Sequence, residues 1–184
     1  MTPESSRITV YMENPALRRY TMLMAANCLD ASALVKWYVT EAGSDILRQY
    51  LRKQPTVYTT LFCYFESLSV LKVKRFYKKS PENITDEEYH KAAFELSAWF
   101  SASSKHLPDL DLVDPLTFPK VQSIAHRHTL DLSDVFQILS VISGFFSPLC
   151  GDSKTILVTA DKRLAEAARA EGARVWNPLA EPPP

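Results

Sequence analysis

The amino-acid sequence predicts an α/β protein, a three-layer α/β/α sandwich with a mainly parallel central sheet. Short apolar or β-branched runs alternate with longer stretches of helical composition, which is the order typical of βαβ units whose helices cover both faces of a sheet. A chain of 184 residues can bury roughly 70% of its unfolded surface, so one core suffices and no disulfide or metal is needed to stabilise it.

The first half of the chain contains two strand-to-helix units. Residues 22–29 form a short apolar run, which predicts a buried strand, and residues 31–38 read as the helix that follows it. After a turn at Gly43 we expect a helix over 44–53. The second unit is a strand at 56–60 followed by a long helix at 61–79 that contains neither Gly nor Pro. A capping box at 85–88 then starts another helix, whose apolar stripe is Tyr89, Ala93, Leu96 and Phe100.

The second half repeats this alternation. Ile156, Leu157 and Val158 are the centre of its clearest strand, and Gly172 is placed to end the helix after that strand. The expected elements are a short strand at 112–113, helices at 118–128 and 132–143, a loop at 144–153, a strand at 154–159, a helix at 162–171 and a strand at 174–176.

These elements form one domain over residues 22–178. Residues 1–21 mix Pro, charged and polar residues and are predicted to be an extension without a role in the core, and residues 179–184 a C-terminal tail. No apolar run approaches the ~18 residues of a membrane span, and the N-terminus lacks the pattern of a secretory signal. We therefore expect a cytoplasmic protein without a membrane partner.

Composition excludes several kinds of site. Cys28, Cys63 and Cys150 are an odd number without CxxC spacing, which favours small buried side chains over disulfides or zinc. Four Gly residues in the whole chain are too few and too scattered for a phosphate-binding P-loop or a dinucleotide fingerprint. The net charge is zero, yet residues 46–81 hold eight Lys or Arg and one carboxylate, Glu66.

Four carboxylates lie at comparable places in the predicted fold. Asp30 ends the first strand, Asp134 opens a helix, Asp161 follows the strand at 154–159, and Glu66 lies in the first turns of the helix after the second strand. Parallel strands bring their carboxyl ends to one edge of a sheet, so these groups can converge there. Asp is also a preferred N-cap, so each of the three Asp residues could merely satisfy helix N–H groups.

Glu66 is harder to explain as a structural residue. It shares a helix face with Phe62, Val70 and Val73, and every Lys or Arg of its helix lies at Lys72 or beyond, more than one turn away. Unit charges ~4 Å apart repel by about 4 kcal/mol at an effective dielectric near 20, so three or four carboxylates at one edge would resist full ionisation without a metal ion.

An all-oxygen donor set suits Mg²⁺, or Mn²⁺ as its substitute, and such a site can activate water for phosphodiester cleavage. Ser32 and Thr159, each two residues from an Asp, are candidates to support the carboxylates by hydrogen bonds. A run of basic residues beyond Glu66 is usually a solvated helix face, but beside such a site it could contact an RNA backbone. This run consists of Lys72, Lys74, Arg75, Lys78 and Lys79.

The sequence resembles PIN-domain proteins, in particular the VapC-type toxins of toxin–antitoxin pairs. The matching stretches occur in the family's order and read CLDASALVKWYVTEAGS, FCYFESLSVLKVKRF, HTLDLSDVFQILSVIS and TILVTADKRLAEAARAEGARVWNP. By position the resemblance implies that Asp30, Glu66 and Asp134 are the acidic triad and Asp161 a fourth, more variable carboxylate, with Ser32 and Thr159 supporting them.

The resemblance also implies a function and partners. Residues 22–178 would be a PIN-like nuclease domain with Mg²⁺- or Mn²⁺-dependent endoribonuclease activity, frequently homodimeric and inhibited by a small cognate antitoxin. Two alternatives stay open: an RNA-processing nuclease without an antitoxin, and a non-catalytic PIN-like module that binds RNA or protein through the same groove.

Overall fold

The computed structural model describes residues 26–77, 79, 83–102, 114–144 and 155–184. Four strands form one sheet in the order β2-β1-β3-β4, and every neighbouring pair is parallel. The strands are β1 (Ala26–Leu29), β2 (Thr56–Thr59), β3 (Ile156–Val158) and β4 (Arg174–Trp176).

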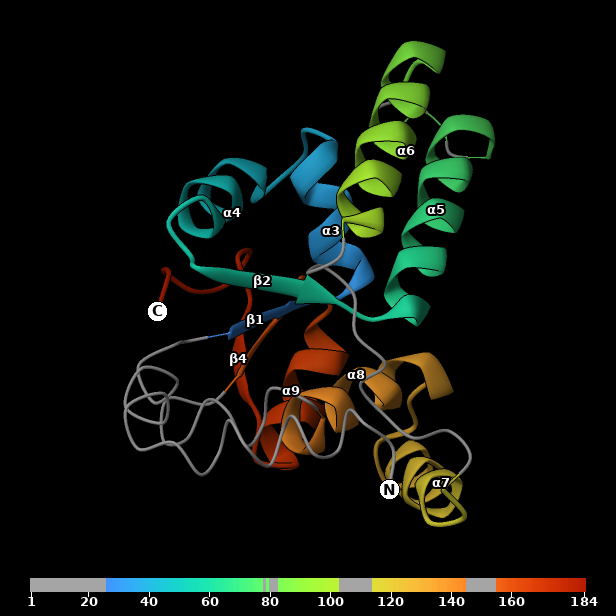
Figure 1. Cartoon of the computed structure of the whole chain (residues 1–184), viewed down its shortest axis with the longest axis vertical. Coiled ribbons are helices and arrows are strands. Elements are labelled where there is room, and N and C mark those ends of the chain that lie inside the picture. The colour runs from blue at the N-terminus through green and yellow to red at the C-terminus, as the bar shows by residue number, and fades with distance from the viewer. Residues whose placement is uncertain (1–25, 78, 80–82, 103–113, 145–154) are drawn as a thin grey trace.

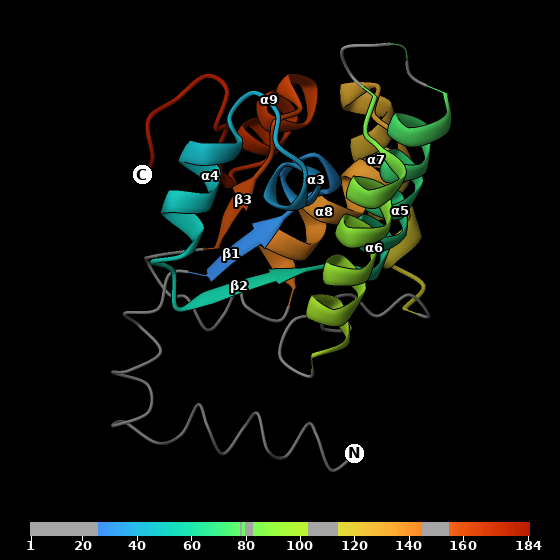
Figure 2. The ribbon, with the colours of Figure 1, turned by 90° about the horizontal axis from the view of Figure 1, so that it is seen from above.

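Helices lie on both sides of the sheet (Figure 1). One side carries α3 (Ala31–Tyr38), α4 (Ser44–Leu51), α5 (Leu61–Phe76) and α6 (Asp86–Ser101). The other side carries α7 (Thr117–His128), α8 (Leu132–Ser143) and α9 (Lys162–Ala170). Figure 2 shows that β1 leads into α3 and that β2 runs toward α5.

Alternation along the strands produces the two faces, because successive side chains of a strand point to opposite sides of the sheet. Strands β1, β2 and β3 each contribute apolar side chains to both cores. Leu29, Val57, Ile156 and Val158 belong to the core under α3–α6, whereas Cys28, Tyr58 and Leu157 belong to the core under α7–α9. The predicted three-layer α/β/α sandwich is confirmed.

Local signals in the sequence explain several helix boundaries. The capping box that precedes α6 is formed: the Glu88 amide donates to Thr85 Oγ1 at 3.1 Å, and the Thr85 amide donates to Glu88 Oε2 at 2.7 Å. Gly172 follows the C-cap residue of α9 and has φ +86°. Glycine adopts this left-handed conformation at low steric cost, so the helix can end here.

The observed elements differ from the predicted ones mainly in length. The helix expected at 61–79 ends at Phe76, and the strand expected at 154–159 pairs over Ile156–Val158. The predicted N-terminal extension at 1–21, the short strand at 112–113 and most of the loop at 144–153 lie outside the described residues. None of the helices in the described part of the chain combines the length and hydropathy that crossing a bilayer requires.

The start of the C-terminal tail is attached to the domain. Trp176 Nε1 donates to the Glu181 carbonyl at 3.2 Å, and Glu181 also pairs with Arg169. Leu179 lies against Gly43, where φ is +81° and an added Cβ would come within 2.8 Å of Leu179 Cδ2. These contacts attach the segment after β4 to β4 itself, to α9 and to the turn before α4.

Candidate active site

Three polar residues come directly after strands β1, β2 and β3. The register pairs Leu29 with both Thr59 and Val158. The next residue along each strand is therefore at the same edge of the sheet, its carboxyl edge. Those residues are Thr60, Asp30 and Thr159.

Asp30 is buried at this edge, with 5% of its surface exposed, and its carboxylate is surrounded by donors. Oδ1 accepts from the Ala33 amide at 2.8 Å and from Ser32 Oγ at 2.9 Å, and Oδ2 accepts from Thr159 Oγ1 at 2.7 Å. Burial raises the pKa of Asp30 to about 6; the donors limit the rise, and the charge of Glu66 adds to it.

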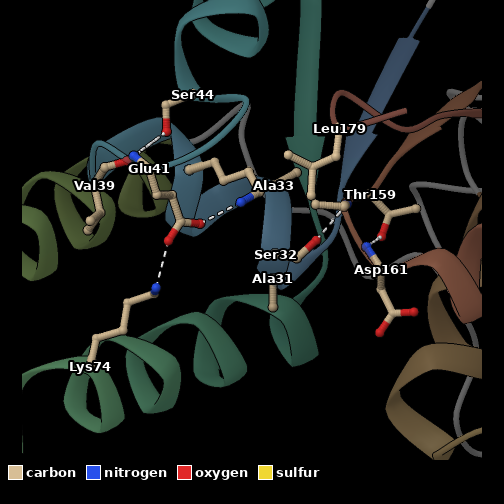
Figure 3. Close-up of polar contacts among 12 residues, drawn as sticks. Ala31, Ser32, Ala33, Val39, Glu41, Ser44, Lys74, Thr159, Asp161 and Leu179 are labelled. Atoms are coloured by element: carbon tan, nitrogen blue, oxygen red, sulfur yellow. Dashed lines mark hydrogen bonds and ion pairs between the residues drawn. The ribbon is translucent and has the colours of Figure 1, made fainter. Parts of the chain in front are cut away.

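Ser32 and Thr159 connect Asp30 to the chain after β3. Ser32 Oγ accepts from the Ala160 amide at 2.7 Å, and Thr159 Oγ1 accepts from the Asp161 amide at 2.9 Å. Figure 3 shows the Asp161 amide directed at the Thr159 hydroxyl. Both hydroxyls thus donate to Asp30 while accepting from the segment between β3 and α9, which fixes the orientation of the carboxylate.

Asp134 lies in the first turn of α8 and is partly exposed. Burial raises its pKa to about 7, and repulsion from Glu66, Asp161 and Asp30 contributes, in that order. Its surroundings contrast with those of Asp30, because no hydrogen bond from the described residues reaches the Asp134 carboxylate and the side chain does not cap α8.

Glu66 lies on α5, a turn and a half after the end of β2, and is partly buried. Burial raises its pKa, with further increases from the charges of Asp131 and Asp161. The charge of Glu66 in turn raises the pKa of both Asp30 and Asp134, which lie on other elements.

Asp161 is exposed and has a structural role as well. Its Oδ1 accepts from the Leu164 amide at 3.0 Å, so Asp161 is the N-cap of α9. Asp30 likewise caps α3 through the Ala33 amide, in addition to its bonds with Ser32 and Thr159. Its charge still contributes to the raised pKa of both Glu66 and Asp134.

Asp131, the residue before α8, is a further carboxylate near the site that the strand-end pattern of the sequence does not indicate. Its charge is the largest electrostatic cause of the raised pKa of Glu66 and also acts on Asp134. The signal was present as the spacing Asp131-x-x-Asp134 in DLSD, since residues three apart share one face at a helix start.

The all-oxygen donor set of these groups suits a hard divalent cation, but the spacing of the side chains does not yet form a metal site. Among the described residues, no three His, Cys, Asp or Glu side chains are grouped so that they could hold one metal ion. The donors are nevertheless all carboxylate oxygens, and the charges of Glu66 and Asp134 oppose each other without a basic partner among the groups that shift them. A cation that binds here would have to draw these side chains together.

The predicted RNA-contacting residues divide into two groups. Lys74 Nζ donates to Glu41 Oε2 at 2.6 Å, as Figure 3 shows, and Arg75 Nε donates to Asp86 Oδ1 at 2.5 Å. Lys72 and Lys79 are exposed, and Lys78 lies outside the described residues. Two of the predicted phosphate contacts are thus already neutralised within the protein.

Comparison with known proteins bears on the fold. The chain is similar in structure to PAE2754 from Pyrobaculum aerophilum, with a TM-score of 0.50, 19% sequence identity, and coverage of 82% of this chain and 83% of that chain. No model of a known protein family and no curated protein matches the sequence. At this identity the likeness concerns the arrangement of helices and strands alone.

Proposed function

We propose that this protein is a metal-dependent endoribonuclease, which uses Mg²⁺ or Mn²⁺ to hydrolyse RNA phosphodiester bonds. The observation that carries the proposal is the set of carboxylates with raised pKa values at the carboxyl edge of the sheet. Asp30 and Asp134 have pKa values of about 6 and 7, and Glu66 is shifted in the same direction. Such groups repel one another when ionised, and a divalent cation removes this repulsion.

Asp30, Glu66 and Asp134 would hold the cation, with Asp161 and Asp131 at the periphery of the site. When bound, Mg²⁺ would polarise a phosphodiester oxygen and make water a better nucleophile near neutral pH. Ser32 and Thr159 keep Asp30 in one orientation by their hydrogen bonds at 2.9 and 2.7 Å. In the metal-free protein, burial and the neighbouring charges raise the pKa of Asp134 to about 7, which favours its protonated form more than in an ordinary aspartate.

The choice of RNA as substrate, and of a toxin as the biological role, comes from the resemblance to PIN-domain toxins. With it come a cytoplasmic location, a homodimer and a small antitoxin partner as parts of the proposal. An exposed apolar stretch on α5 is compatible with a protein partner: the exposed fractions of Phe62, Phe65 and Phe76 are 39%, 58% and 56%.

A cleavage assay with matched variants tests the proposed activity. We expect the wild-type protein to cleave RNA in Mg²⁺ and to lose activity in EDTA. Asp134→Asn should lower the cleavage rate by on the order of a thousandfold, because a metal ligand supplies several kcal/mol of transition-state stabilisation. Asp45→Asn is the control, since Asp45 is an exposed carboxylate on α4, with 87% of its side chain accessible.

The outcomes separate the proposal from its alternatives. Cleavage that survives EDTA or Asp134→Asn would indicate a contaminating nuclease, and RNA binding without cleavage would favour a non-catalytic module. For the role as a toxin, induced expression should stop growth of the host, and co-expression of a small protein encoded next to the gene should restore it. Unaffected growth would favour an RNA-processing nuclease.

A further inference from the structure

A buried hydrogen bond connects the start of α5 to α8. Thr60 is the N-cap of α5: its Oγ1 accepts from the Cys63 amide at 3.3 Å and donates to Gln137 Oε1 at 3.0 Å. Both residues are buried, with exposed fractions of 4% for Thr60 and 1% for Gln137. Thr60 is at the same level of the sheet edge as Asp30, yet it bonds to the neighbouring helix.

The Gln137 amide is an expensive group to bury for this one bond. Its Nε2 atom has no hydrogen-bond partner in the part of the chain that the structure describes, although it is inaccessible. An unsatisfied buried donor costs about 1–3 kcal/mol, which a Met or Leu at this position would avoid. Stability alone therefore favours an apolar residue at 137, and the amide calls for another explanation.

An aromatic contact joins the same two helices beside the hydrogen bond. The rings of Phe62 and Phe136 stack with their centroids 4.7 Å apart and an angle of 13° between the planes. Phe62 is in the first turn of α5, and Phe136 precedes Gln137 on α8. The hydrogen bond and the stack thus attach the N-terminal turn of α5 to one segment of α8.

These attachment points lie close to the carboxylates along each helix. Asp134 is three residues before Gln137, less than one turn of α8, and Glu66 is six residues after Thr60, about 9 Å along the axis of α5 at 1.5 Å per residue. A helix behaves as a rigid element over such lengths, so the relation between Thr60 and Gln137 also determines the relation between Glu66 and Asp134.

We propose that Gln137 is a positioning residue, which sets the separation of Glu66 and Asp134 through its buried hydrogen bond to Thr60. It touches neither substrate nor metal. The purpose of this positioning, cation binding, rests on the proposed function, whereas the fixed relation of α5 to α8 does not.

Gln137→Met tests the proposal, because Met has a similar volume, removes the hydrogen bond, and exchanges the unsatisfied Gln137 donor for the released Thr60 hydroxyl. We expect the urea midpoint of unfolding to change little, and the affinity for Mn²⁺, measured by electron paramagnetic resonance, to fall about tenfold or more. RNA cleavage at saturating Mn²⁺ should show a lower kcat with a nearly unchanged KM. Thr60→Ser keeps the hydroxyl and the cap and should bind Mn²⁺ within twofold of wild type.

Tyr64→Phe is the matched control. It removes another hydrogen bond of α5, the 3.0 Å contact between Tyr64 Oη and Ser97 Oγ that joins α5 to α6. A residue that acts through general stability would weaken Mn²⁺ binding in this control as well. We expect Tyr64→Phe to leave the affinity unchanged.

A distance measurement decides the positioning independently of the proposed function. Nitroxide labels at the exposed positions 69 on α5 and 132 on α8, in a Cys150→Ser background, report the separation of the two helices by double electron–electron resonance. Gln137→Met should broaden or shift the distance distribution, and Tyr64→Phe should not. An unchanged distribution in Gln137→Met would overturn the positioning role. If the wild-type protein does not bind Mn²⁺, the proposed function is rejected, but the distance measurement still decides whether Gln137 fixes the relation of α5 to α8.

Discussion

Asp30 and Asp134 belong to the same acidic site but have opposite surroundings. Three donors, from α3 and from the strand end after β3, hold the Asp30 carboxylate, whereas no hydrogen bond from the described residues reaches Asp134. These donors offset part of the cost of burying the Asp30 charge, although burial still raises the pKa of Asp30 to about 6. The charge of Asp134 is opposed by Glu66, Asp161 and Asp30. Under the proposed function, this difference makes the region around Asp134 and Glu66 the part of the site where a cation would relieve the most repulsion.

The largest effect on stability is expected from the cation. At a Mg²⁺ concentration one hundred times the dissociation constant, binding to the folded state adds about 2.7 kcal/mol, which raises the melting temperature by about 5–10 °C for a chain of this size. Asp134→Asn should lose most of this shift. Scanning calorimetry with and without Mg²⁺ measures it, and equal shifts in Asp134→Asn and Asp45→Asn would mean that Mg²⁺ binds elsewhere.

Replacing each aspartate by Asn should change stability in opposite directions. Asp30→Asn relieves a buried charge, but it also places an NH₂ group against donors at a cost of about 1–3 kcal/mol for each bond that is lost, so the free energy of unfolding should fall. Asp134→Asn breaks no hydrogen bond and removes a repelled charge, so it should raise the free energy of unfolding by about 0.5–1 kcal/mol. Urea unfolding at pH 8 in EDTA, where both carboxylates are ionised, compares them; destabilisation of similar size in both would remove the contrast.

The raised pKa values of Asp30 and Asp134 also predict how the stability of the protein depends on pH. The pKa values of Asp30 and Asp134 in the folded protein, about 6 and 7, lie above the ordinary aspartate value of 3.8. Between pH 4 and 7 the folded state therefore binds more protons than the unfolded state, and the two groups make the protein less stable as pH rises through this window. Asp134→Asn should flatten the upper part of the curve, and the full slope in that variant would speak against a raised pKa at Asp134.

The smallest expected effects come from replacing Lys72 and Lys74, two lysines of α5 with different surroundings. Lys74 pairs with Glu41, and both side chains are mostly buried, at 15% and 23% exposure, so Lys74→Met should lower the free energy of unfolding by about 1 kcal/mol. Lys72 is exposed, so Lys72→Met should leave stability unchanged and raise KM for RNA a few-fold. Urea unfolding and steady-state kinetics distinguish the two roles. Equal KM effects for both variants would contradict this division.

The order of elements and the location of the acids were predictable because both depend on local patterns. Asp30, Thr159 and Asp161 follow short apolar runs, and the parallel sheet that such runs form brings their ends to one edge. Glu66 stood out as a carboxylate on a largely apolar helix face, and its raised pKa agrees with that assessment.

Features that depend on distant partners were not predictable. The ion pairs of Lys74 with Glu41 and of Arg75 with Asp86 join residues 33 and 11 positions apart, and nothing in the run of basic residues indicates them. The bond from Thr60 to Gln137 spans 77 positions. Asp131 gives no distinct signal by itself in the sequence, because a polar residue before a helix is common for local reasons, although its charge acts on Glu66.

A carbon-13 NMR titration of the aspartate and glutamate carboxyl groups, in metal-free wild-type protein and in Glu66→Gln, tests most directly whether these acids form one site. We expect the Asp134 carboxyl to titrate near pH 7 in the wild type and at lower pH in Glu66→Gln, since one source of repulsion is gone. An Asp134 resonance that titrates near pH 4 in both proteins would show that the carboxylates do not act on one another.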